Sequence, residues 1–501
     1  MEAHHFLAFD LGAESGRTIL GTLGDGKVVT RELTRFPNGP ARLAGHLHWN
    51  LLSLFEDIKR GLRACATQAR VVPESVAVDT WGVDFGLLGK DGSVLGFPYA
   101  YRDERTRGMM EEFFRHTPRE KVYERTGIQF LPFNSLFQLY AMVRQRSPLL
   151  DCARDLLFMP DLFTYLLSGE KANEFTIAST SQLLDMRSRV WSTELMAGLG
   201  VPMGILQRVV PPGTDLGKLV PSVAQETELP EVRVIATAGH DTAAAIAAIP
   251  AAGENWAYIS SGTWSLMGIE TAEPIITHAA LEANFTNEGG VSETIRFLKN
   301  IAGLWLLQQS RKEWARDEEL SYAQLADLAA GAKAFRSLVD PDWPEFLNPP
   351  SMPDAIRQFC LLSGQPAPAA PAEFARCILE SLALKYRFTL DQLRRLTDRR
   401  VEMIHVIGGG SRNELLCQFT ADATGLPVVA GPAEATATGN IMVQALGLGY
   451  VRSLAEIRSV VRRSVELKAY APQAREDWES AFTRFRELIR ADIPAPKKTL
   501  P

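Results

Sequence analysis

One short pattern, an apolar strand followed by a polar turn with glycine and a second apolar strand, occurs at the start of the chain and again near its middle. In the first copy the apolar runs are residues 6–9 and 18–23. In the second copy residues 256–259 and 264–269 flank the turn 260–263. Apolar runs of this length bounded by such turns are typical of strands. One copy in each half predicts a duplicated α/β domain.

The length of the chain also favours two domains, because 501 residues exceed what one hydrophobic core usually serves. The segment 250–254, with its Pro, Ala and Gly residues, is a plausible boundary. We therefore expect an N-terminal domain over 1–249, a C-terminal domain over 250–490 and a disordered tail over 491–501.

Two segments of the second half have contrasting patterns. Residues 371–396 begin with Pro and Glu and carry apolar residues at helical spacing, which predicts a long helix. Residues 340–371 are rich in proline, and we expect an irregular surface loop there.

Charge, hydropathy and cysteine content exclude several classes of protein. The formal net charge of -6 argues against nucleic acid or an anionic membrane as the main partner. No run of about 18 apolar residues occurs, so we expect no membrane span, and we expect no signal peptide because the first residues lack its basic and apolar regions. Widely spaced cysteines in odd number are typical of reduced thiols in a cytoplasmic protein. They are Cys65, Cys152, Cys360, Cys377 and Cys417.

The turn of the first copy carries groups that suit a phosphate. Its backbone N–H groups and hydroxyl can contact phosphate oxygens, and Asp10, at the end of the first strand, can hold Mg²⁺ through water. An ordinary polar turn whose Asp binds its own backbone explains the same residues. The candidate phosphate-binding segment is residues 10–17.

Two further turns have the same character. The second copy has Ser260, Ser261, Gly262 and Thr263 between its strands, and a plain hairpin turn is the simpler explanation of that sequence. A third turn, with Gly408, Gly409 and Gly410, follows a strand and precedes a helix over 414–423, so its backbone can approach a nucleotide closely. The patterns of Rossmann dehydrogenases and of P-loop enzymes are absent, which counts against both classes.

The segment Gly239-His240-Asp241-Thr242 lies between an apolar strand and an Ala-rich helix. At a helix N-terminus the dipole keeps Asp241 ionised, and an ionised carboxylate can accept a proton from a substrate hydroxyl. The competing explanation is that Asp241 is only an N-cap, the commonest role of Asp before such a helix. His240 can equally be a structural histidine.

Together these motifs resemble the FGGY carbohydrate kinases, a family of the actin, Hsp70 and hexokinase ATPase superfamily. The resemblance covers residues 6–449 and rests on four motifs: D-L-G-A-E-S-G-R (10–17), S-S-G-T-W-S (260–265), V-I-G-G-G-S-R-N (406–413) and G-H-D-T (239–242). Longer segments resemble the rhamnulokinase branch of the family. These are residues 79–85, 100–103, 127–134, 159–163, 286–290 and 298–308.

The resemblance implies two ribonuclease H-like domains, of the actin/hexokinase ATPase type, flanking a central cleft. It implies ATP as cosubstrate, Mg²⁺ as cofactor and L-rhamnulose, phosphorylated to L-rhamnulose 1-phosphate in L-rhamnose catabolism, as substrate. The implied ATP contacts are Ala13, Glu14, Ser15, Gly16, Arg17, Thr263, Gln308 and Gly409. The implied sugar contacts are Trp81, Gly82, His240, Asp241, Thr242 and Asn300, with Asp241 as base. Glu14 departs from the small polar residue expected there, and we expect its carboxylate to turn outward.

Three alternatives remain at this point. The first is the same chemistry on another ketose, such as L-fuculose or L-xylulose. Only a few side chains of a pocket distinguish sugars that differ by one hydroxyl. The second is an ATP-driven conformational protein of the actin or Hsp70 type, and the third is a non-catalytic sugar sensor. The G-H-D-T segment and the retained Asp10 and Asp241 speak against the last two. We expect a monomer or a small homo-oligomer, with no nucleic-acid or membrane partner.

Overall fold

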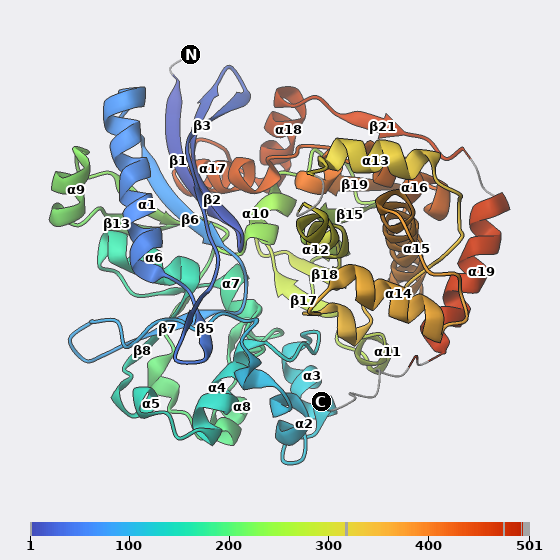
Figure 1. The fold of residues 1–501 in the computed structure, drawn as a ribbon. Coiled ribbons are helices and arrows are strands. Elements are labelled where there is room, and N and C mark those ends of the chain that lie inside the picture. Colours follow the sequence, from blue (N-terminus) through green and yellow to red (C-terminus); the bar gives the residue numbers. More distant parts are fainter. Residues whose placement is uncertain (1–2, 316–318, 474–475, 492, 494–501) are drawn as a thin grey trace. The chain divides into compact units, whose positions relative to one another are not determined.

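The computed structural model describes residues 3–315, 319–473, 476–491 and 493 (Figure 1). The chain divides into two compact units. The first consists of Met1–Ala252, Glu270–Phe297 and Ala435–Val465, and the second of Gly253–Ile269, Leu298–Glu434 and Glu466–Pro501. The chain therefore passes from one unit to the other several times. The tail expected over 491–501 lies outside the described residues, apart from Ala491 and Ile493.

The first unit is built on a six-stranded sheet with the order β13-β14-β6-β1-β2-β3. Strand β1 pairs antiparallel with β2 and parallel with β6, and β14 continues the parallel part. The strands are β1 (His4–Leu11), β2 (Ser15–Gly24), β3 (Lys27–Pro37), β6 (Ser75–Thr80), β13 (Thr214–Lys218) and β14 (Arg233–Ala236). The short strands of this unit are β4 (Ala41–Leu43), β5 (His46–His48), β7 (Phe85–Leu88), β8 (Asp155–Phe158), β9 (Asn173–Glu174), β10 (Leu184–Asp185), β11 (Val190–Trp191), β12 (Val209–Val210) and β17 (Thr286–Gly289).

Helices cover both faces of this sheet, which explains why β1 is apolar at successive positions. Leu7 and Phe9 share one core cluster with residues of α1 and α6, whereas Phe6 and Ala8 share another with α17 and α18. The helices of the unit are α1 (Leu51–Ala64), α2 (Met109–Phe113), α3 (Arg119–Thr126), α4 (Ser135–Arg144), α5 (Pro148–Cys152), α6 (Met159–Ser168), α7 (Phe175–Ser179), α8 (Thr193–Leu199), α9 (Pro221–Thr227), α10 (Asp241–Ala247), α11 (His278–Glu282), α17 (Ala435–Gly447) and α18 (Leu454–Ser464).

The second unit repeats the plan of the first. Its strands belong to a seven-stranded sheet with the order β17-β18-β16-β15-β19-β20-β21, and β15 pairs antiparallel with β16 and parallel with β19. Strand β20 continues the parallel part and β21 closes the edge antiparallel, as β14 and β13 do in the first sheet. The strands are β15 (Trp256–Ser261), β16 (Trp264–Thr271), β18 (Ile295–Ala302), β19 (Met403–Ile407), β20 (Val428–Ala430) and β21 (Lys468–Tyr470). The predicted duplication of an α/β domain is thus confirmed.

The long helix expected over 371–396 is α15, which runs from Pro371 to Thr397 and is buried along much of its length. The expectation of an irregular loop over 340–371 was wrong in part. Residues Met352–Leu362 form α14, which begins with Ser351 as N-cap and accommodates Pro353 in its first turn. Prolines at a helix start therefore accounted for some of the loop-like composition. The other helices of this unit are α12 (Trp305–Trp314), α13 (Tyr322–Gly331), α16 (Glu414–Thr424) and α19 (Glu476–Arg490).

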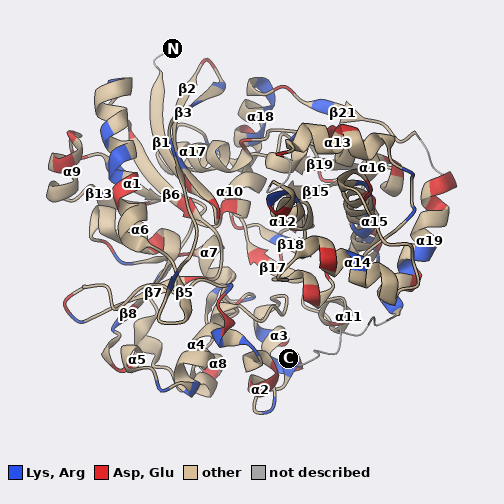
Figure 2. Cartoon of the chain, in the orientation of Figure 1, with Lys and Arg blue, Asp and Glu red and all other residues tan. Residues whose placement is uncertain are grey.

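Along α1 and α19 the first charged side chains are acidic and most of the later ones are basic (Figure 2). Among the described residues, no helix is both long enough and apolar enough to cross a membrane. The cysteines are all free thiols, four of them buried and Cys152 exposed.

Candidate active site

Two carboxylates lie side by side where β1 and β6 end. Asp10 and Asp79 are partners in the parallel register of these strands, and both are buried. Burial and the charge of Asp10 raise the pKa of Asp79 well above its usual range. On the other side of β1, Arg17 donates a hydrogen bond to Asp10. The strand ends thus bring two buried carboxyl groups together, and one guanidinium contacts the first of them.

The turn between β1 and β2 is tighter than the sequence indicated. Because β1 extends to Leu11 and β2 begins at Ser15, only residues 12–14 lie outside the strands. Gly12 N–H donates to the Ser15 carbonyl at 2.9 Å, and Asn38 donates to the carbonyls of Gly12 and Glu14. Gly12 and Glu14 carbonyls are thus held by Asn38, which sequence reasoning missed. The Glu14 side chain is exposed, as expected.

Asp241 is the first residue of α10, and its N-cap is His240. The explanation of Asp241 as an N-cap therefore does not hold. Its carboxylate accepts a hydrogen bond from the Thr242 hydroxyl at 3.1 Å, and about 30% of the side chain is exposed. Asp241 also raises the pKa of Asp79 through its charge.

The loop before α10 lies against the end of β6. Thr80 N–H donates to the Gly239 carbonyl at 2.9 Å, and a β-carbon on Gly82 would lie 3.4 Å from His240 Nε2. The hydrogen bond between Thr80 and Gly239 brings the predicted sugar contacts of the first unit together. They are Trp81, Gly82, His240, Asp241 and Thr242.

A buried carboxylate holds the turn that contains Trp81. Asp84 Oδ2 accepts hydrogen bonds from the indole N–H groups of Trp49 and Trp81 and from Tyr101 N–H. Gln138 donates to its other oxygen. Burial raises the pKa of Asp84 to about 6, although these donors favour its ionised form. Trp81 is therefore fixed by its polar end, an arrangement that sequence alone did not reveal.

A second buried carboxylate, Glu174, holds the loop that precedes Asp241. Its side chain accepts hydrogen bonds from Gly239 N–H at 2.9 Å and from the hydroxyl and N–H of Thr176. The Thr176 hydroxyl also accepts from His240 N–H. Burial raises the pKa of Glu174 to about 7. Glu174 thus connects α7 to the loop and determines its position.

A polar ladder on α17 reaches the same strand ends. Asn440 donates to Asp79 Oδ2 at 2.6 Å, and Gln444 donates to Asn440 and to the Leu7 carbonyl. Ser75 in turn donates to Gln444. These residues lie far apart in sequence, and nothing in the local pattern around residue 440 indicated that it contacts Asp79.

In the second unit, the turn between β15 and β16 lies between two other loops. Thr263 accepts hydrogen bonds at its carbonyl from Gly303 N–H and Trp305 N–H, both at 3.1 Å. On the other side, a β-carbon on Gly410 would lie 2.0 Å from the Ser261 hydroxyl oxygen. The glycine turn and the start of α12 therefore meet at the turn that contains Thr263.

This packing places three of the predicted ATP contacts, Thr263, Gln308 and Gly409, on adjoining elements. Gln308 lies one turn into α12, and its Oε1 is buried without a hydrogen-bond partner among the described residues. Gly409 is exposed, and a β-carbon there would meet no atom within 4 Å. The fourth predicted residue of this unit, Asn300, is half-buried in β18, two residues before Ala302, whose N–H donates to Asp342.

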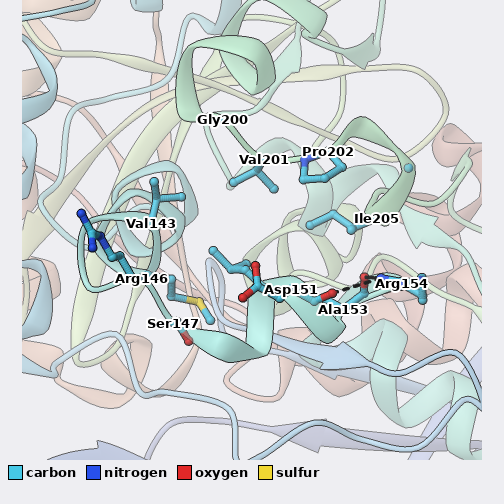
Figure 3. A pocket seen from close by; sticks show the side chains of 13 residues that line it. Val143, Arg146, Ser147, Asp151, Ala153, Arg154, Gly200, Val201, Pro202 and Ile205 are labelled. Carbon is cyan, nitrogen blue, oxygen red and sulfur yellow. Dashed lines mark hydrogen bonds between the residues drawn. The ribbon is translucent and has the colours of Figure 1, made fainter.

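The first unit also has a pocket of about 650 Å³ (Figure 3). None of the predicted sugar or ATP contacts lines it. Its lining includes Val143, Arg146, Asp151, Val201 and Ile205 from the ends of α4, α5 and α8. The Arg154 guanidinium donates hydrogen bonds to the carbonyls of Asp151 and Ala153.

Known proteins match the chain along almost its whole length. Residues 5–248 match the N-terminal domain, and residues 257–448 the C-terminal domain, of the FGGY family of carbohydrate kinases. A rhamnulokinase of Bacteroides thetaiotaomicron is 48% identical over 97% of this chain and 99% of its own. A rhamnulokinase of Pectobacterium carotovorum is 44% identical over 99% of both chains.

Solved structures agree in fold at low identity. A gluconate kinase from Lactobacillus acidophilus has a TM-score of 0.82 at 15% identity, with 99% of each chain covered. A xylulose kinase from the same organism has a TM-score of 0.81 at 15% identity, with 98% of each chain covered. These neighbours confirm the two-domain ATPase fold expected from the sequence. Both domains of the family match this chain, and a relative is 48% identical over 97% of it. Together with the duplicated sheets, this shows that the chain belongs to the FGGY family of carbohydrate kinases.

Proposed function

We propose that this chain is a rhamnulokinase, which transfers the γ-phosphoryl group of ATP to the C1 hydroxyl of L-rhamnulose. The observation that carries the proposal is the identity of 48% over 97% of the chain with a protein named rhamnulokinase. The geometry supports it, because a partly exposed carboxylate, Asp241, begins a helix beside the residues predicted to contact the sugar.

In the proposed reaction, Asp241 orients the acceptor hydroxyl and takes its proton. Phosphoryl transfer passes through a loose transition state, so positioning and charge stabilisation supply most of the rate and a strong base is not required. The exposure of about 30% lets the Asp241 carboxylate reach a substrate. Thr242, which donates to Asp241, keeps one carboxylate oxygen in place.

The sugar contacts proposed for the first unit are Trp81, Gly82, His240, Asp241 and Thr242, with Asn300 from the second unit. Gly82 leaves room in front of His240, since a β-carbon there would lie 3.4 Å from the imidazole. Trp81 is fixed by Asp84, so its indole can serve as a rigid wall. Rigid contacts of this kind are suited to distinguishing sugars that differ by one hydroxyl.

The ATP contacts proposed are Ala13 and Glu14 of the turn and Ser15, Gly16 and Arg17 of β2, together with Thr263, Gln308 and Gly409. The residues fit such a ligand in two respects. The space in front of Gly409 admits close approach to the backbone, and Gln308 Oε1 is a buried acceptor that lacks a donor among the described residues.

We further propose Mg²⁺ as cofactor, held by Asp10 directly or through water. No group of three or more metal-ligating His, Cys, Asp or Glu side chains occurs among the described residues, so the phosphates of the nucleotide would have to supply further ligands. The donor set suits the ion, because Asp79 Oδ1, beside Asp10, is a buried oxygen without a partner in the described part of the chain. Bound Mg²⁺ would neutralise charge on the transferred phosphoryl group.

Three further points belong to the proposal. The scattered free cysteines favour a cytoplasmic location, and we propose a monomer or small homo-oligomer without nucleic-acid partners. The proposed sequence domains remain 1–249 and 250–490.

A coupled assay of ADP release over a panel of ketoses tests the proposal. L-Rhamnulose should give the highest kcat/KM. If L-fuculose, L-xylulose or another ketose exceeds it by about tenfold, worth roughly 1.4 kcal/mol in the transition state, the substrate is wrong while the kinase activity stands. If no ketose stimulates ADP release, the kinase proposal itself fails.

A further inference from the structure

Behind His240 lies an ion pair that is shut off from solvent. Arg296, in the part of β18 that belongs to the first unit, has no exposed surface, and Glu288 of β17 is 5% exposed. The two side chains form an ion pair at 3.1 Å, and Arg296 Nε donates to the Gly289 carbonyl at 2.7 Å. Their common neighbour is the imidazole of His240.

Only one ring nitrogen of His240 faces this pair. Its Nδ1 lies 3.1 Å from Arg296 Nη2 and 3.4 Å from Glu288 Oε2. The other nitrogen, Nε2, lies 3.5 Å from Asp241 Oδ1 and faces the position of Gly82. The two nitrogens therefore have different surroundings, one buried and one directed toward the proposed sugar site.

Donor and acceptor chemistry assigns the proton on the ring. A guanidinium has only donors and keeps its charge in proteins, so the contact at 3.1 Å is a hydrogen bond only if Nδ1 is the acceptor. In the neutral imidazole the proton then resides on Nε2. Glu288 favours the opposite tautomer, because a carboxylate accepts a proton from Nδ1–H, but it lies farther away and is engaged by Arg296.

We propose that Arg296 is a positioning residue that holds His240 in the tautomer protonated on Nε2, so that a fixed N–H donor faces the substrate. This inference rests on the proposed function only in naming the substrate as a ketose. The donor selects a sugar oxygen as its partner and otherwise points at the Asp241 carboxylate. Without Arg296, Glu288 would draw the proton to Nδ1. The lone pair on Nε2 would then face and repel the Asp241 carboxylate, and no N–H donor would remain for a sugar oxygen.

The direct test is the tautomer of His240 in the free wild-type protein. Long-range proton–nitrogen correlation NMR on protein with ¹⁵N-labelled histidine distinguishes the two ring nitrogens, and a spectrum of His240→Gln assigns the signals. We expect protonation on Nε2 only. Protonation on Nδ1 would overturn the inference without any assay of activity, and it would leave the proposed function untouched.

Variants then test the role of the guanidinium. Arg296→Met should shift the His240 proton to Nδ1 and raise KM for the ketose at least tenfold, with KM for ATP nearly unchanged. Glu288→Gln should keep the proton on Nε2. The matched control is Arg376→Met, which removes the arginine from another pair with a fully buried carboxylate, Glu380, and should leave the tautomer unchanged. An Arg296→Met protein that keeps the Nε2 proton would refute the role of Arg296.

Discussion

Gly439 of α17 packs directly against the backbone carbonyl of Ala244 in α10, so closely that a β-carbon on Gly439 would lie 1.7 Å from the Ala244 oxygen. The two helices touch here without a side chain between them. Because Asp241 begins α10, this contact helps to position the proposed base.

The first prediction concerns this contact. Gly439→Ala should force α10 away from α17, because the colliding atom is backbone and has no alternative rotamer. Overpacking of a core usually costs about 1–3 kcal/mol, so Tm should fall by roughly 1–5 °C, and kcat should fall with it. Gly331→Ala, at the end of α13, is a matched control, since a β-carbon there meets no atom within 4 Å. Equal Tm values for both variants would contradict this view of the contact.

The second prediction tests Asp241 as base. Asp241→Asn is close to isosteric, and His240 is the N-cap of α10, so the fold should be retained. Loss of the proton acceptor should lower kcat roughly 10²-fold or more, the usual scale for a general base. Binding of ATP, measured by calorimetry, should be nearly unchanged. Near-normal turnover would exclude Asp241 as base and make Asp10 or Asp79 the next carboxylate to test.

The third prediction separates two neighbouring glycines. Gly409→Val should fold normally, since the position is open, but its branched side chain would enter the space proposed for the nucleotide. KM for ATP should rise far more than KM for the ketose. Gly410→Ala should instead lower Tm, because its β-carbon would collide with Ser261. If Gly409→Val affects both substrates equally in a stable protein, the glycine turn does not serve ATP.

The fourth prediction concerns pH and Glu174. Burial raises the pKa of Glu174 from 4.5 to about 7, so between these values the folded protein holds a proton that the unfolded chain has lost. Stability from this group is therefore complete below about pH 4.5 and decreases as pH rises through 7. Glu174→Gln removes the titration. The free energy of unfolding of wild type minus that of the variant should fall between pH 5 and pH 8, by at most about 3 kcal/mol. The difference between their Tm values should fall over the same range. A constant difference would contradict the raised pKa.

Local pattern was enough to predict the elements that carry the site. The strands of both copies, the helix α15 and the helix start at Asp241 follow from apolar spacing and from Pro or Gly at boundaries. The sequence left Asp241 with two possible roles, because an Asp before an Ala-rich run is equally typical of an N-cap. Only the backbone shows that His240 takes that position.

Residues that act through packing were not predicted. Asn440, Arg296 and Glu174 reach Asp79, His240 and Gly239 from elements that are distant in sequence. No spacing rule links such residues, since each contact depends on how distant segments pack together. Only Glu288 had an indirect signal, because it lies within the T-N-E-G-G segment (286–290) that resembles rhamnulokinases.

The return of α17 and α18 to the first unit has a consequence for synthesis on the ribosome. The face of the first sheet that Ile441 and its neighbours cover, with Phe6, Ala8 and Ile19, is made early, while its covering helices follow only after most of the second unit. Synthesis adds about 5–20 residues per second, so that apolar face remains uncovered for on the order of ten seconds or more. We expect a nascent chain halted near residue 252 to bind chaperones, and release to native structure only once residue 465 has emerged.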